Sequence, residues 1–213
     1  VGGALREGTG EPLSLEPPGT APAPTGCPRL ESPGMQRLSI RILALFGWKV
    51  TGALPAQPRF VLIVAPHTSN WDFPIGVLAM FAVQIRLTWL GKHTLFVFPV
   101  ARLLRWLGGE PVDRRVRGGL VEQAIERFRT RPQWVLAIAP EGTRKRVEQW
   151  KTGFYRIAIG AGVPVLPVAI DFSKKALDLG TLYWPVGDET QDLAALRARY
   201  HAGMAKFPGE YGG

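Results

Sequence analysis

A histidine and an aspartate, His67 and Asp72, follow an unbroken apolar run over residues 60–64. Such a run predicts a buried strand, and Pro74 favours a helix that begins just after the pair. On a continuous helix, five steps would place the two side chains about 140° apart, so they meet only if they lie in a loop between the strand and the helix. An aspartate that fixes the tautomer of a histidine makes that histidine a general base. The pair alone is also compatible with a purely structural contact.

A second group of polar residues follows another apolar run, at residues 134–138, which also predicts a buried strand. Glycine in this group allows the backbone to approach a ligand closely, and the basic residues suit a phosphate group. The group consists of Glu141, Gly142, Thr143, Arg144 and, further along the chain, Lys151. Glu141 is also compatible with a bond to a backbone amide, and Arg144 with a surface ion pair.

Two further basic residues stand near the ends of predicted strands. Lys92 follows a predicted strand at residues 85–90, and Arg114 lies in a short strand or turn at residues 110–115. Because ligands of open α/β sheets bind at the carboxyl ends of the strands, we expect both residues to lie near His67. As an isolated arginine, Arg114 is also compatible with a surface ion pair.

The elements that must position these residues alternate along the chain. Apolar periodicity predicts helices at 35–50, 73–84, 96–107, 119–130, 152–160 and 190–206, and further strands at 163–170 and, weakly, 182–184. Strands that alternate with helices predict an α/β single-domain sandwich, with a largely parallel central sheet flanked by helices.

The N-terminal part of the chain divides in two by composition. Residues 1–34 are rich in proline and glycine, which predicts a disordered tail before a folded domain at 35–213. The only cysteine, Cys27, lies in this tail, so we expect no disulfide and no cysteine metal site. Residues 35–50 form a basic amphipathic pattern that suits a membrane interface or a helix packed on the core.

The net charge of +9 indicates an anionic partner, either a phosphorylated molecule or an anionic lipid surface. Nucleic acid is disfavoured, because no helix-turn-helix, zinc-finger or RNP-type pattern occurs. No apolar run reaches the length of roughly 18 residues that a transmembrane helix needs, and no signal peptide is recognisable. We therefore expect a peripheral protein on the cytoplasmic face of the membrane.

The order of these blocks resembles the glycerolipid acyltransferase family, which includes the bacterial 1-acylglycerol-3-phosphate acyltransferases. His67 and Asp72 resemble the first block, with its catalytic histidine and orienting aspartate. Residues 112–114 match the end of the second block, residues 140–144 match the third, and residues 163–168 resemble the fourth. The resemblance covers about residues 38–172.

This resemblance implies an acyltransferase domain that moves a fatty acyl group to a lysophospholipid hydroxyl, most directly that of 1-acylglycerol 3-phosphate, in phospholipid biosynthesis. The donor would be acyl-CoA or acyl carrier protein, with no metal and no cofactor beyond this co-substrate. His67 would be the general base and Asp72 would orient it. Residues of the acceptor site would be Lys92, Arg114, Glu141, Gly142, Thr143, Arg144 and Lys151.

Departures from the family pattern leave the acceptor open. Pro111 replaces a bulky apolar residue of the second block, and Lys145 and Arg146 follow the third block where a serine is common. Glycerol 3-phosphate or another lipid headgroup is the alternative acceptor. A non-catalytic basic module on anionic membranes is a further alternative. A lipid hydrolase is disfavoured, because no Gly-x-Ser-x-Gly elbow occurs.

Overall fold

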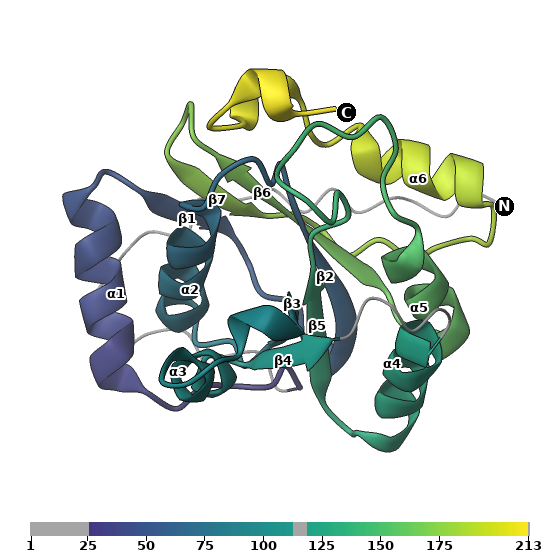
Figure 1. Ribbon diagram of the computed structural model, residues 1–213, viewed down its shortest axis with the longest axis horizontal. Coiled ribbons are helices and arrows are strands. Elements are labelled where there is room, and N and C mark those ends of the chain that lie inside the picture. The colour runs from purple at the N-terminus through teal and green to yellow at the C-terminus, as the bar shows by residue number, and fades with distance from the viewer. Residues whose placement is uncertain (1–25, 113–118, 213) are drawn as a thin grey trace, which may run out of the picture.

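The computed structural model describes residues 26–112 and 119–212 of the chain. Its core is one seven-stranded sheet in the order β1-β7-β6-β2-β5-β3-β4 (Figure 1). The strands are β1 Lys49–Gly52, β2 Arg59–Ala65, β3 Thr88–Lys92, β4 Gly109–Val112, β5 Trp134–Ile138, β6 Val165–Asp171 and β7 Ala176–Leu179. All neighbours are parallel except β6 and β7, which run antiparallel. The predicted α/β fold with a largely parallel sheet is confirmed.

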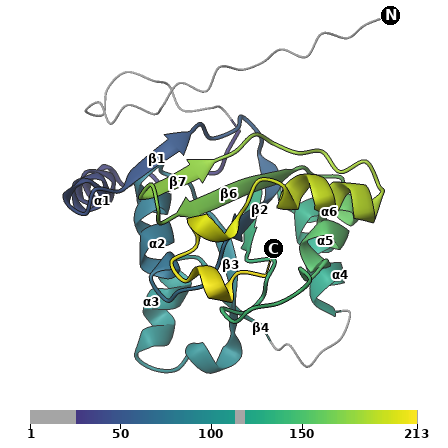
Figure 2. The same ribbon diagram turned by 90° about the horizontal axis from the view of Figure 1, so that it is seen from above.

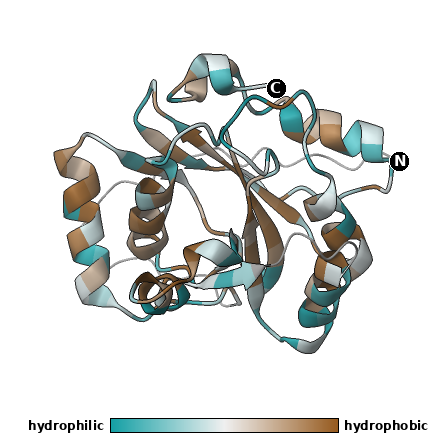
Figure 3. Ribbon diagram, viewed as in Figure 1, coloured by the Kyte–Doolittle hydropathy of each residue, from teal (hydrophilic) through white to brown (hydrophobic). Residues whose placement is uncertain are grey.

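Helices cover both faces of this sheet (Figure 2). They are α1 Pro33–Leu45, α2 Asp72–Ala82, α3 Val100–Trp106, α4 Gly119–Thr130, α5 Gly153–Ala161 and α6 Glu189–Arg197, with short 3-10 turns η1 His93–Leu95, η2 Ala202–Met204 and η3 Pro208–Glu210. Residues of α1 and α2 pack into one core, and residues of α4, α5 and α6 pack into the other. The central strands are apolar on both faces, as a doubly covered parallel strand requires (Figure 3).

The predicted helix at 35–50 is wrong at its C-terminal end. Helix α1 ends at Leu45, and Gly47 follows with a φ of +73°. Val50 instead belongs to β1, which pairs in parallel with β7. Both strands have four residues, and neither was predicted, because such short edge strands have too few residues to show a periodic pattern.

The C-terminal predictions also need correction. The weak strand at 182–184 is a single bridge between Tyr183 and Val165, and α6 ends at Arg197 rather than at residue 206. Residues beyond it form η2 and η3.

The tail predicted to be disordered contains ordered residues at its C-terminal end. Cys27 is buried, and Arg29 forms a bridge with Ile85. The Leu30 amide donates to the Gln84 carbonyl oxygen at 2.9 Å. The predicted disorder is therefore wrong for residues 26–34, which pack against the end of α2, while residues 1–25 lie outside the described part of the chain. Across the described ranges, no helix combines the length and the apolar character needed to cross a bilayer.

Candidate active site

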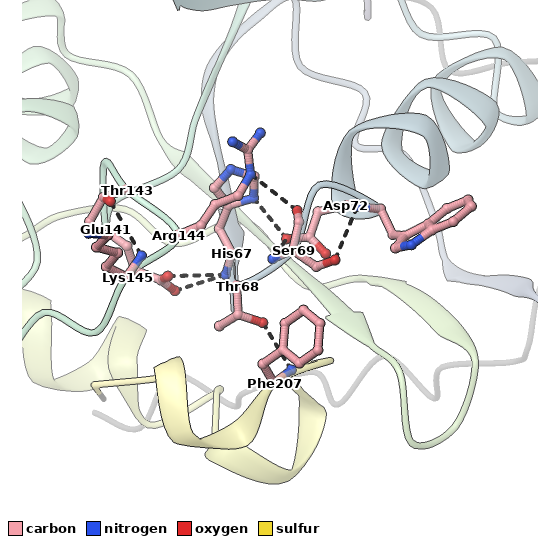
Figure 4. Close-up of polar contacts among 10 residues, drawn as sticks. His67, Thr68, Ser69, Asp72, Glu141, Thr143, Arg144, Lys145 and Phe207 are labelled. Carbon is pink, nitrogen blue, oxygen red and sulfur yellow. Dashed lines mark hydrogen bonds and ion pairs between the residues drawn. The ribbon is translucent and has the colours of Figure 1, made fainter.

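The predicted contact between His67 and Asp72 is present, and it joins the loop after β2 to the first residue of α2 (Figure 4). His67 Nδ1 lies 3.0 Å from Asp72 Oδ2; the histidine side chain is 21% exposed and the aspartate side chain 1%. The other ring nitrogen, Nε2, has no hydrogen-bond partner among the described residues. A histidine held in this way, with one nitrogen on a buried carboxylate and the ring reaching solvent, is suited to accept a proton.

Ser69 holds the aspartate in place. Its amide donates to Asp72 Oδ2 at 2.9 Å, and its hydroxyl accepts from the Trp71 amide at 3.1 Å. The two contacts close a turn just before α2, in which the acidic side chain reaches back to an amide three residues earlier. The role of Ser69 was not predicted, although serine and aspartate at this spacing are known to bond to nearby backbone amides in turns.

Glu141 fixes the backbone of His67 rather than facing an open site. Both of its carboxylate oxygens accept from the His67 amide, at 3.0 and 3.2 Å, and the residue is 2% exposed. Burial raises the pKa of the Glu141 carboxyl, against the opposing effect of the hydrogen bond from His67. The expected direct contact of Glu141 with a substrate does not fit this burial.

Arg144 joins the two predicted motif segments. Its Nε donates to the Ser69 carbonyl oxygen at 3.2 Å, while the side chain is exposed. The Thr143 hydroxyl accepts from the Lys145 amide at 3.3 Å. Residues 141–144 therefore lie against the His67 loop, and the exposed Arg144 side chain bridges the two segments.

Gly142 and Lys151 lie side by side. Gly142 has a φ of +67°, and a Cβ at this position would lie 2.9 Å from Lys151 Cδ. The Lys151 amide donates to the Pro140 carbonyl oxygen at 2.8 Å, and its side chain is exposed. Glycine at this position therefore lets the Lys151 side chain cross the motif.

The two remaining predicted basic residues differ in what the structure describes. Lys92 ends β3 and is exposed at the carboxyl edge of the sheet. The strand order places β3 two positions from β2, which carries the His67 loop. Arg114 lies outside the described residues.

The C-terminal segment contacts both motif loops, which sequence reasoning missed. The Phe207 amide donates to the Thr68 hydroxyl at 3.3 Å, across 139 residues of sequence (Figure 4). The Arg146 amide donates to Glu210 Oε2 at 3.1 Å. Lys206 Nζ lies 5.1 Å from the centroid of the Trp71 ring. No local sequence pattern signals contacts over such a separation.

A cavity of about 270 Å³ lies elsewhere, over β1, β7 and β6. Its lining includes Lys49, Asp171, Asp178 and Arg199, and none of the predicted site residues. In the part of the chain that the structure describes, no three His, Cys, Asp or Glu side chains are grouped as metal ligands would be.

Comparison with known proteins places this site in a family. The 1-acyl-sn-glycerol-3-phosphate acyltransferase of Escherichia coli K12 is 31% identical over 153 residues, which cover 67% of this chain and 61% of that protein. The Haemophilus influenzae protein of the same name is 29% identical over 148 residues, covering 65% and 60%. This chain thus spans less than two thirds of the length of the curated relatives that it matches.

A solved structure has a similar fold. The 1-acyl-sn-glycerophosphate (LPA) acyltransferase PlsC from Thermotoga maritima superposes with a TM-score of 0.56 at 24% identity, over 75% of this chain and 71% of that one. The Acyltransferase family model matches residues 48–171, more than half of the chain and a range that contains His67, Asp72 and residues 141–144. The chain therefore belongs to the acyltransferase family, as the order of its motifs indicated.

Proposed function

We propose that this protein is an O-acyltransferase that moves a fatty acyl group from an acyl thioester to the free hydroxyl of 1-acylglycerol 3-phosphate. The observation that carries the proposal is the 3.0 Å contact between His67 Nδ1 and the buried Asp72, in a chain of the acyltransferase family. The names of the relatives, 1-acyl-sn-glycerol-3-phosphate acyltransferases, support this acceptor and a place in phospholipid biosynthesis.

The proposed reaction needs one proton transfer and one displacement. His67 Nε2 takes the proton of the acceptor hydroxyl while the hydroxyl oxygen attacks the thioester carbonyl carbon. The new ester C–O bond forms, the C–S bond breaks, and the proton leaves with the thiol. Asp72 stabilises the imidazolium through Nδ1 and keeps Nε2 directed at the acceptor.

Basic residues around the loop are proposed to hold the acceptor phosphate. Arg144 lies exposed beside the His67 loop, Lys151 lies exposed beside Gly142, and Lys92 stands at the same edge of the sheet. Arg114 of the second block is proposed for the same role from its motif position. The donor is proposed to be acyl-CoA or acyl carrier protein, as a co-substrate and not a resident cofactor.

The acceptor is an amphiphile, so we propose that the protein works as a peripheral protein on the cytoplasmic face of the membrane. Helix α1 supports this location, because Leu45 at its end and Phe46 just beyond it are 80% and 63% exposed. Apolar side chains held at a basic surface favour a lipid interface.

The test is acyl transfer from labelled acyl-CoA, and separately from acyl carrier protein, to lysolipids and glycerol 3-phosphate. His67→Ala should lower kcat by roughly 10²- to 10⁴-fold, the usual contribution of a general base. His201→Ala is the matched control, because His201 is exposed and lies outside both motifs. Full activity of a folded His67→Ala protein would contradict the proposal, and release of free fatty acid without an acceptor would indicate a hydrolase.

A further inference from the structure

We propose that the segment from η1 to the end of α3 docks on an anionic lipid bilayer. The apolar side chains that it exposes form what we call the α3 surface. They are Leu95, Val97, Phe98, Val100, Leu103 and Trp106. Figure 3 shows the hydrophobic character of α3. Scattered exposed apolar residues are normal, but a dense group within one short segment marks an interaction site.

Of these side chains, Trp106 also packs on the domain, since the centroid of its ring lies 5.6 Å from that of the Phe81 ring in α2. Ala101 and Leu107 are buried, so they attach α3 to the domain. Phe98, by contrast, is 95% exposed, and Leu103 is 54% exposed. The α3 surface therefore remains available for a partner while the helix is held by its other side.

The charges of the segment match an anionic partner. No acidic residue occurs between Lys92 and Trp106. Lys92, Arg102 and Arg105 are exposed among the apolar side chains, and the Arg105 guanidinium lies 6.0 Å from the centroid of the Phe96 ring. Basic groups beside aromatic and aliphatic side chains suit the boundary between lipid headgroups and acyl chains. An acidic protein partner would also complement these basic charges. It would not account for an apolar side chain as exposed as that of Phe98.

Packed aromatic rings hold the segment in place. The Trp89 ring on β3 lies 5.0 Å from that of Phe73, next to Asp72, and 5.9 Å from that of Phe96. The Trp89 indole N–H donates to the Leu107 carbonyl oxygen at 2.9 Å, just beyond α3. The α3 surface is thus fixed to β3 and to the first turn of α2, rather than carried on a free loop.

The position of this surface suits the proposed acceptor. In the sheet, β5 separates β3 from β2, and strands are about 4.8 Å apart, so η1 begins roughly 10 Å from the strand that carries His67. A lipid diffusing in a bilayer under the α3 surface would arrive beside the His67 loop. This placement rests on the proposed function, whereas the binding itself does not.

The test is co-sedimentation with phosphatidylcholine vesicles, with and without phosphatidylglycerol. The variant Val97→Ser/Phe98→Ser/Leu103→Ser should bind anionic vesicles at least about tenfold more weakly than wild type. The control Ile159→Ser/Val186→Ser changes residues that are 43% and 69% exposed outside this segment, and it should bind as wild type does.

A second pair of variants tests the charges. Arg102→Gln/Arg105→Gln should weaken binding to anionic vesicles by roughly tenfold or more at low salt, and leave the weaker binding to neutral vesicles unchanged. Arg129→Gln/Arg156→Gln removes two exposed arginines from α4 and α5 and should have no such effect.

Three results would overturn the proposal. One is wild-type vesicle binding by the serine triple variant with its circular dichroism unchanged. Another is that Leu45→Ser/Phe46→Ser abolishes binding while the serine triple variant weakens it by less than about tenfold, which would assign docking to the end of α1. The third is a triple variant that binds vesicles normally but loses activity only with acyl carrier protein, which would assign the surface to an acidic protein. His67→Ala should bind vesicles as wild type does. Vesicle binding therefore tests the α3 surface even if the proposed acyl transfer is not observed.

Discussion

At the scale of single residues, the His67 loop depends on a buried carboxylate that is remote in sequence. Glu141→Ala leaves the His67 amide without its acceptor, which should cost about 1–3 kcal/mol in free energy of unfolding. It should also lower kcat, because the backbone that carries the histidine loses its support. Glu141→Gln keeps one acceptor oxygen and should restore part of both losses.

Steady-state kinetics and urea unfolding of both Glu141 variants distinguish a positioning residue from a substrate-binding one. A positioning role lowers kcat with little change in KM, in proportion to the lost hydrogen bond. A raised KM at unchanged kcat would contradict that role and return Glu141 to the acceptor site.

Cys27 offers a pH-dependent readout of the N-terminal packing. Burial raises the pKa of its thiol from 9.0 to about 11. The folded state therefore keeps the proton that the unfolded state releases, so this contribution to stability is present below pH 9.0 and is lost as pH rises toward about 11. Near pH 8 the thiolate fraction of Cys27 in the folded protein should be about 100-fold lower than in the unfolded chain, because the pKa of about 11 lies so far above 9.0.

Thiol labelling with and without denaturant measures this effect. Labelling of native Cys27 by a disulfide reagent should be at least about 100-fold slower than labelling in guanidinium chloride. In the pH profile of stability, Cys27→Ala should remove the decline above pH 9.0 that is due to the thiol. Equal labelling rates in the two states would show that residues 26–34 do not pack as described.

At the scale of elements, two glycines should respond in opposite directions to alanine. A Cβ at Gly76, inside α2, meets nothing within 4 Å, so Gly76→Ala should stabilise the protein by about 0.5–1 kcal/mol through helix propensity. A Cβ at Gly109, on β4, would lie 2.6 Å from the Trp89 ring and 2.7 Å from the Leu104 carbonyl oxygen. Gly109→Ala should therefore cost about 1–3 kcal/mol by overpacking the support of α3.

Chemical denaturation at equilibrium checks both glycine variants in one experiment. The change should appear in the midpoint, with an unchanged denaturant slope. A stabilising Gly109→Ala would contradict the close approach of β4 to Trp89, and with it the rigid support of the α3 surface.

At the scale of the whole molecule, the C-terminal segment connects the two motif loops to one core. Tyr211 is 8% exposed and packs with the residues between the sheet and α5. Tyr211→Ala should lower the free energy of unfolding by about 3 kcal/mol through loss of buried area and the cavity that remains. Activity should fall as well, because Phe207 and Glu210 of this segment bond to the motif loops.

The matched control is Tyr211→Phe. The Tyr211 hydroxyl is buried and forms no hydrogen bond with any residue the structure describes, so its removal should not destabilise the protein. Thermal unfolding and activity measured on the same samples give the comparison. Equal losses of stability and activity in Tyr211→Ala and Tyr211→Phe would assign the effect to the hydroxyl group and not to the packing of the ring.

The sequence by itself determined the features that have a local pattern. Apolar runs marked β2 and β5, and apolar periodicity placed α4 at residues 119–130, as the structure has it. The spacing of His67 and Asp72 excluded a continuous helix for their contact, and the structure places His67 in the loop after β2 and Asp72 at the first position of α2. Each of these depends on residues within a few positions of one another, where strand alternation, helix periodicity and turn chemistry operate.

Only the tertiary structure decided the features that depend on distant partners. Strands β1 and β7 have four residues each and are stabilised by pairing with one another across the chain. Cys27 is buried because the segment 26–34 meets the end of α2. Glu141 lies 74 residues from the amide that it binds, and Phe207 lies 139 residues from Thr68. Local sequence cannot report such contacts, because their free energy arises only when folding removes both partners from water together.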